Sequence, residues 1–136
     1  MIREAICIGV FSLLFVSLGN AASLTRGGIE YGPEKEMSGV YFTNFENSKF
    51  VECGGPADCD NWVKKEAEWV NCVPLACQDL QSRVQKLNES LSKWGDFNIV
   101  FVGCRSLHRR VKEFIGDTES KVLVERILRL EKRTTP

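Results

Sequence analysis

The chain has 136 residues, a length that fits one domain and excludes a large multidomain enzyme. Hydrophobic residues make up 43% and charged residues 26%, so the polypeptide can bury a core and does not have the composition of a disordered tail. The 18 Lys and Arg residues balance 18 Asp and Glu residues, which argues against a protein that coats polyanions in general.

The N-terminal segment has the pattern of an export signal. A short n-region carries Arg3, an apolar stretch runs from Ala5 to Leu18, and small residues follow at Gly19 and Ala21. About 14 apolar residues are too few to cross a hydrocarbon core of ~30 Å at ~1.5 Å per residue. We therefore expect residues 1–21 to be a signal peptide cleaved after Ala21. This predicts a periplasmic or secreted protein with no transmembrane segment after cleavage.

The cysteines bear on the redox state of the exported chain. Cys7 lies in the expected signal, and an odd number remains after cleavage: Cys53, Cys59, Cys72, Cys77 and Cys104. Disulfides are the default in an oxidising compartment, although spacing alone does not fix which cysteines pair. The simplest pairing joins Cys53 to Cys59 and Cys72 to Cys77, which leaves Cys104 as a candidate free thiol or as the partner of a cysteine elsewhere. A zinc site on the first four thiols is disfavoured, because their spacing lacks Cys-x-x-Cys knuckles.

The chain after the signal divides into a leader and one domain. Residues 22–37 are Gly-rich and polar without hydrophobic periodicity, which predicts a flexible leader, and residues 38–136 are expected to form a single domain. β-branched and aromatic residues in 39–46 and 49–53 predict a β-hairpin. A Gly/Pro/Asp loop follows, and we expect a short third strand at residues 61–63.

The second half of the domain contains the clearest helix. Leu80, Val84, Leu87 and Leu91 recur at helical spacing, and Gly95 is expected to end this helix. Residues 97–104 form a continuous apolar run, which predicts a central buried strand. Residues 121–131 fit both a strand and a helix, and their early valines favour a strand.

The order of strands and helix suggests a fold. Three strands, a helix and two strands is the order of a five-stranded OB barrel, whose helix sits between strands 3 and 4. The series Gly39-Val-Tyr41, Phe45-Glu46-x-Ser48-x-Phe50, Cys53 and Trp62 resembles small exported bacterial proteins with an OB-like barrel. This resemblance covers mainly residues 39–62. It implies a mainly β fold with one helix and an exported setting, but no activity.

Charge is uneven along the chain and singles out one connection. Residues 23–80 hold 5 basic and 10 acidic side chains, whereas residues 81–136 hold 12 basic and 7 acidic ones. The expected connection between the fourth and fifth strands carries a basic cluster and an aromatic residue: Arg105, Arg109, Arg110, Lys112 and Phe114. In OB folds this connection helps to bind ligands. These are our candidate binding residues, for a protein or an anionic envelope component. Nucleic acid is not expected as a ligand after export. Alternatively, the acidic half of the chain neutralises the loop.

The sequence offers little for catalysis. His108 is the only histidine, and Cys104 with His108 is the only pair worth testing for thiol chemistry. Phosphate loops, nucleophile elbows and His-Glu zinc motifs are absent, so we assign no catalytic residue, metal or cofactor. Our leading hypothesis is a non-enzymatic exported binding or structural module of the cell envelope. The alternatives are a small thiol-dependent enzyme and a disulfide-stapled secreted inhibitor or effector.

Overall fold

The structure is a computed structural model that describes residues 24–44, 47–90, 92, 94–114 and 117–133. The expected signal peptide, residues 1–21, and Cys7 within it lie outside these described residues. Within the described ranges, no helix is long and apolar enough to span a bilayer.

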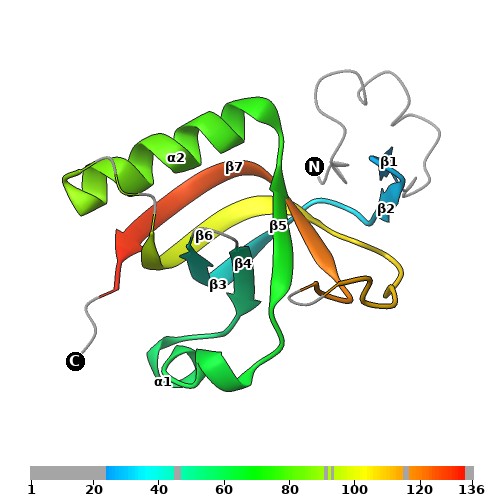
Figure 1. The fold of residues 1–136 in the computed structure, drawn as a ribbon, viewed down its shortest axis with the longest axis horizontal. Helices are drawn as coiled ribbons and strands as arrows, with labels where there is room; N and C mark the ends of the chain where they lie inside the picture. Colours follow the sequence, from blue (N-terminus) through cyan, green and yellow to red (C-terminus); the bar gives the residue numbers. More distant parts are fainter. Residues whose placement is uncertain (1–23, 45–46, 91, 93, 115–116, 134–136) are drawn as a thin grey trace, which may run out of the picture.

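Five strands close a small barrel (Figure 1). Around the barrel the order is β3-β4-β5-β7-β6, and β6 pairs with β3 to close it. Neighbouring strands are antiparallel except for β5 and β7, which are parallel. The strands are β3 (Lys35–Thr43), β4 (Ser48–Glu52), β5 (Glu68–Cys72), β6 (Gly95–Arg105) and β7 (Lys121–Lys132). The mainly β barrel expected from the sequence is confirmed, including the hairpin formed by β3 and β4 and the choice of strand over helix for β7.

One long helix, α2 (Pro74–Asn88), lies between β5 and β6, which are the third and fourth strands of the barrel. Proline at the first turn suits a helix start, since its missing N–H has no partner there anyway. The helix ends before Gly95, the end expected from the sequence, because Glu89 adopts a left-handed conformation with a φ of 53°. The Asn88 side chain then donates hydrogen bonds to the carbonyls of Ser92 at 3.0 Å and Trp94 at 2.9 Å in the following loop. Gly95 instead begins β6, with a φ of 141°.

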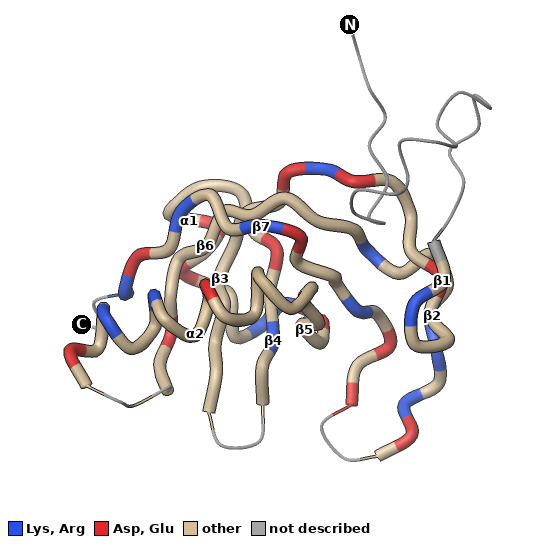
Figure 2. Tube along the Cα trace, turned by 90° about the horizontal axis from the view of Figure 1, so that it is seen from above, with Lys and Arg blue, Asp and Glu red and all other residues tan. Residues whose placement is uncertain are grey.

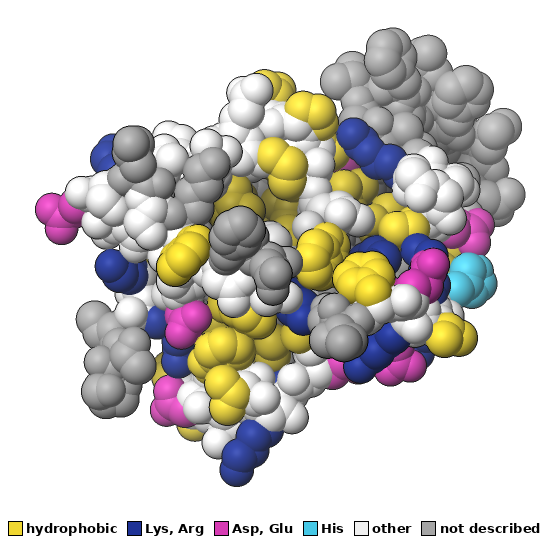
Figure 3. Space-filling view, viewed as in Figure 1, with side chains coloured by type: hydrophobic (Ala, Val, Ile, Leu, Met, Phe, Trp, Pro, Cys, Tyr) yellow, Lys and Arg dark blue, Asp and Glu magenta, His cyan; other side chains and the backbone are white. Residues whose placement is uncertain are grey.

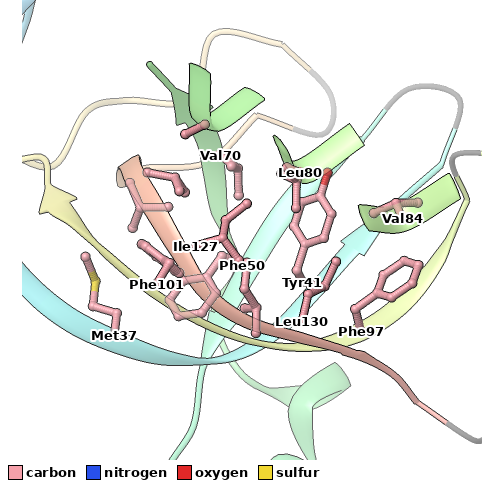
Figure 4. Packing of buried hydrophobic residues seen from close by; sticks show 14 residues of the cluster. Met37, Tyr41, Phe50, Val70, Leu80, Val84, Phe97, Phe101, Ile127 and Leu130 are labelled. Atoms are coloured by element: carbon pink, nitrogen blue, oxygen red, sulfur yellow. The ribbon is translucent and has the colours of Figure 1, made fainter. Parts of the chain in front are cut away.

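The barrel interior is filled by aromatic and aliphatic side chains from every barrel strand and from α2 (Figure 4). The rings of Phe50 and Phe101 meet edge to face, with centroids 4.9 Å apart. On α2, Leu80 and Val84 are 5% and 2% exposed, so the helix closes one side of this core. On β6, Phe97, Ile99 and Phe101 lie in this core, and Cys104 packs against Tyr31 of the segment before the barrel, which accounts for much of the apolar run.

Residues before the barrel also form strands, contrary to the expectation of a flexible leader over residues 22–37. A hairpin of β1 (Leu24–Arg26) and β2 (Ile29–Tyr31) precedes β3. Tyr31 holds the hairpin on the barrel. Its side chain is 1% exposed, packs with Leu123, and accepts a hydrogen bond from Asn71 Nδ2 at 3.0 Å. These contacts are distant in sequence, so local composition did not reveal them.

The expected strand at residues 61–63 is also wrong. A short helix, α1 (Pro56–Cys59), and a 3₁₀ turn, η3 (Trp62–Lys64), occupy this region, and the third barrel strand is β5. Trp62 packs against Phe42 outside the barrel, with ring centroids 5.3 Å apart. The Trp62 ring therefore covers the outside of β3 although its backbone lies in a 3₁₀ turn. Aromatic residues favour strands, which is why an extended segment was expected here.

Candidate functional site

Two disulfides close short loops beside the barrel. Cys53 bonds to Cys59, with Cα atoms 5.2 Å apart, and Cys72 bonds to Cys77, with Cα atoms 5.3 Å apart. These are the pairings expected from the sequence. The first bridge closes the loop after β4, and the second joins the end of β5 to the first turn of α2.

Cys104, near the end of β6, is fully buried. No described cysteine is free, and Cys104 is itself disulfide-bonded. Its exposure is 0%, in a cluster with Tyr31 and Leu123, so its sulfur has no access to solvent. The His108 side chain is 76% exposed, and its Nε2 lies 2.9 Å from Glu30 Oε1. The pair considered for thiol chemistry therefore has no available nucleophile.

Arg105, at the end of β6, belongs to a network of carboxylates. Its Nε donates to Glu68 Oε2 at 2.6 Å, and its Nη2 donates to Glu68 Oε1 and Glu52 Oε1, both at 2.8 Å. Ser120 Oγ donates to the same Glu68 carboxylate at 2.6 Å. Glu68 is 7% exposed, and its hydrogen bonds are the main reason that the pKa of Arg105 lies above its usual range. Two residues of the acidic half thus neutralise this cation.

Arg109 and Arg110 are also paired with carboxylates. Arg109 contacts Glu66 and, at 3.0 Å, Glu119, and both raise the pKa of its guanidinium. Arg110 Nη2 donates to Glu113 Oε1 at 2.6 Å. Carboxylates of the acidic half therefore pair with Arg105 and Arg109, as the alternative interpretation expects, whereas Arg110 pairs with Glu113 of the same connection.

The connection between β6 and β7, residues 106–120, exposes apolar side chains among these ion pairs. Val111 is 86% exposed, Phe114 59% and Leu107 48%, and we call these three residues the apolar tip. Lys112 lies between them in sequence and forms no ion pair with any described residue. Figure 3 shows hydrophobic side chains interspersed with charged ones near the single histidine. The sequence pointed to Phe114. It did not distinguish Leu107 and Val111 from core residues, because their exposure depends on the fold.

The end of the β6–β7 connection that leads into β7 is fixed by hydrogen bonds to buried polar side chains. Asp117 Oδ2 accepts from the backbone N–H of Glu113 at 3.0 Å, and Oδ1 accepts from that of Thr118 at 2.8 Å. These bonds lower the pKa of Asp117 to about 2. Thr118 Oγ1 donates to the Ser120 carbonyl at 2.7 Å and accepts from the backbone N–H of Trp69 at 3.0 Å. The apolar tip is therefore carried by a connection that is bonded to the barrel.

A groove lies on the outer surface of β3, β6 and β7, and we call it the β7 groove. Its volume is about 460 Å³. Ser38, Asn98 and Val100 alternate along their strands with core residues, so they face outward and form the floor. The loop closed by the Cys53–Cys59 disulfide forms one wall. The charged side chains that line the groove are Asp60, Arg129, Glu131, Lys132 and Arg133.

Comparison with family models, curated proteins and solved structures finds no match to this chain. Across the described part of the chain, no cluster of three or more His, Cys, Asp or Glu side chains is placed to hold a metal ion.

Proposed function

We propose that this protein is an exported binding module of the cell envelope, built on an OB-like barrel, that docks a protein partner through its β6–β7 connection. The strand order, the parallel pair of β5 and β7, and the position of α2 between the third and fourth barrel strands support the OB assignment. The signal pattern at residues 1–21 and the two disulfides support an exported setting.

The observation that carries the proposal is the apolar tip. Single exposed apolar residues are common on protein surfaces, but here three large ones lie within eight residues of one connection. The ion pairs of Arg109 and Arg110 lie in the same connection and supply polar, charge-neutralised groups near the tip in sequence. An apolar centre within a polar rim is the usual organisation of a protein interface.

The test is a crosslinking pull-down from the native envelope, comparing wild type with Val111→Asp plus Phe114→Asp. Both positions are exposed, so the variant should fold, and we expect it to lose the crosslinked partner. Leu75→Asp plus Trp94→Asp is the matched control, because it places the same charge at two exposed apolar residues elsewhere. The proposal fails if the partner is retained by the tip variant, or if the control loses it equally.

A disulfide-stapled inhibitor or effector is the second candidate. The two short disulfide loops and the anchored apolar connection also suit a small domain that occupies a pocket of an enzyme. The partner distinguishes the two hypotheses, since an inhibitor must lower the activity of the protein it captures. The thiol-dependent enzyme loses support, because the Cys104 side chain is fully buried.

A further inference from the structure

Strand β7 carries cationic side chains that are not paired with carboxylates. They lie outside the β6–β7 connection that the sequence singled out. Arg129 and Lys132 are exposed and form no ion pair with any described residue. Arg133 is fixed beside them. Its Nη1 donates to Asn98 Oδ1 at 2.6 Å, and its Nη2 lies 3.7 Å from Asp60 Oδ1. Figure 2 shows these basic positions toward the C-terminal end of β7.

The wall of the β7 groove is held in place before any ligand arrives. The Cys53–Cys59 disulfide closes the loop, and Asp58 Oδ2 accepts the backbone N–H of Gly54 at 2.8 Å. Lys65 Nζ lies 2.7 Å from the other oxygen of Asp58. Binding in the groove therefore requires little ordering of this loop, which reduces the entropic cost of association.

Beside the groove, one glycine lets β3 and β4 approach closely. A Cβ atom at Gly39 would lie 2.0 Å from the Val51 carbonyl oxygen, so only glycine allows this close approach of β3 and β4. Next to it, Ser38 is exposed, and Asn98 lies on the adjacent strand. These side chains place a hydroxyl and an amide on the floor, within the same groove as Arg129 and Lys132.

We infer that the β7 groove binds an acidic oligosaccharide and recognises its carboxylates through Arg129 and Lys132. A guanidinium and an ammonium group suit carboxylates, through charge-assisted hydrogen bonds. Asp60 and Glu131 also line the groove, and they can accept hydrogen bonds from sugar hydroxyls. The same two carboxylates would repel the denser charge of a polyphosphate or nucleic acid. The mixed lining therefore favours a ligand that carries both hydroxyl and carboxylate groups.

Isothermal titration calorimetry on the purified full-length mature protein tests this site, with a short oligogalacturonate as probe. An uncharged oligosaccharide of equal length and an inorganic polyphosphate are the comparison ligands. The groove variant is Arg129→Gln plus Lys132→Gln. Its matched control is Lys64→Gln plus Lys86→Gln, which removes the same charge at exposed positions outside the groove.

We expect one oligogalacturonate per chain, with an affinity that falls as salt rises. The groove variant should bind at least about tenfold more weakly, because a charge-assisted hydrogen bond contributes more free energy than a tenfold change in affinity. The control variant should stay within about twofold of wild type. Ser38→Trp fills the groove without changing its charge, and it should also abolish binding.

Several results would overturn the inference: no binding of oligogalacturonate, equal binding of the uncharged sugar, tighter binding of polyphosphate, or equal weakening in groove and control variants. If Ser38→Trp does not fold, the exposed pair Arg129 and Lys132 still decides the question. The inference is independent of the proposed partner, because Val111→Asp plus Phe114→Asp lies outside the groove and should leave oligogalacturonate binding unchanged.

Discussion

Arg105 was a candidate binding residue, and the structure makes it a residue that stabilises the fold. Its guanidinium and Ser120 donate three hydrogen bonds to Glu68, a carboxylate that is only 7% exposed. Glu68→Gln preserves the shape of this side chain and removes its charge. Breaking a fully buried ion pair costs ~3 to 5 kcal/mol, and hydrogen bonds to charged groups contribute ~1.5 to 3 kcal/mol each.

Two features reduce the loss of stability that we expect for Glu68→Gln. The Arg105 side chain is 28% exposed, so water can replace part of what it loses, and Arg105 also keeps its contact with Glu52. We therefore expect the free energy of unfolding to fall by about 2 to 3 kcal/mol, a large part of the ~5 to 15 kcal/mol typical of a domain. Urea unfolding followed by the fluorescence of the three tryptophans measures this change.

A double-mutant cycle that combines Glu68→Gln with Arg105→Met measures the interaction free energy between these two side chains. We expect the double variant to lose less stability than the two single losses added together, by about 2 kcal/mol, because neither partner is then left unpaired. Arg110→Gln is the control, since the ion pair of Arg110 with Glu113 is exposed and should contribute less than about 1 kcal/mol. Additive single effects, or a Glu68→Gln effect no larger than that of the control, would refute the reasoning.

Three further predictions concern acid, a buried carboxylate and a disulfide. Hydrogen bonds from the Glu113 and Thr118 backbone lower the folded-state pKa of Asp117 to about 2, from the ordinary 3.8. Its contribution to stability is therefore present above pH ~4 and lost as pH falls toward 2. We expect Asp117→Asn to be less stable at pH 7 and to show a smaller loss of thermal stability between pH 4 and 2, and an unchanged acid profile would contradict this. Glu125 is half-buried, and its Oε2 has no hydrogen-bond partner among the described residues. Burial, followed by the charge of Glu34, raises its pKa above 4.5, so its ionisation opposes folding as pH rises through that value. Glu125→Gln should raise the melting temperature at pH 7, by a gain below about 1 kcal/mol, and have no effect at pH 3. A loss of stability at pH 7 would exclude this explanation. Replacing both Cys53 and Cys59 by Ser should cost about 2 to 3 kcal/mol in urea unfolding, because the disulfide restrains the unfolded chain, and a loss below 1 kcal/mol would argue against that role.

Local patterns predicted four of the five barrel strands, and they missed β5. Phe97, Ile99 and Phe101 of β6 and the valines Val122 and Val124 of β7 lie in the core. The two disulfides join the cysteines that are nearest in sequence, which was the simplest of the possible pairings. The strand expected at residues 61–63 failed because the aromatic side chain of Trp62 packs equally well from a 3₁₀ turn.

The sequence could not predict which residues distant along the chain are in contact. Glu68 and Arg105 are 37 residues apart, so the sequence could suggest that opposite charges cancel but could not say which cations they would neutralise. Among the described residues, the cations without an ion pair include Arg129 and Lys132 on β7 and Lys112 in the β6–β7 connection. Counting cysteines marked Cys104 as a candidate free thiol or the partner of another cysteine, but a count could not show that its side chain is fully buried.

Site-specific photocrosslinking in the native envelope tests the central claim most directly. A photoreactive amino acid at Val111, in the apolar tip, should give one discrete adduct with a protein partner. The same amino acid at Leu75, which is 77% exposed on α2, should give none. The account is contradicted if Val111 gives no discrete adduct, or if both positions give the same one.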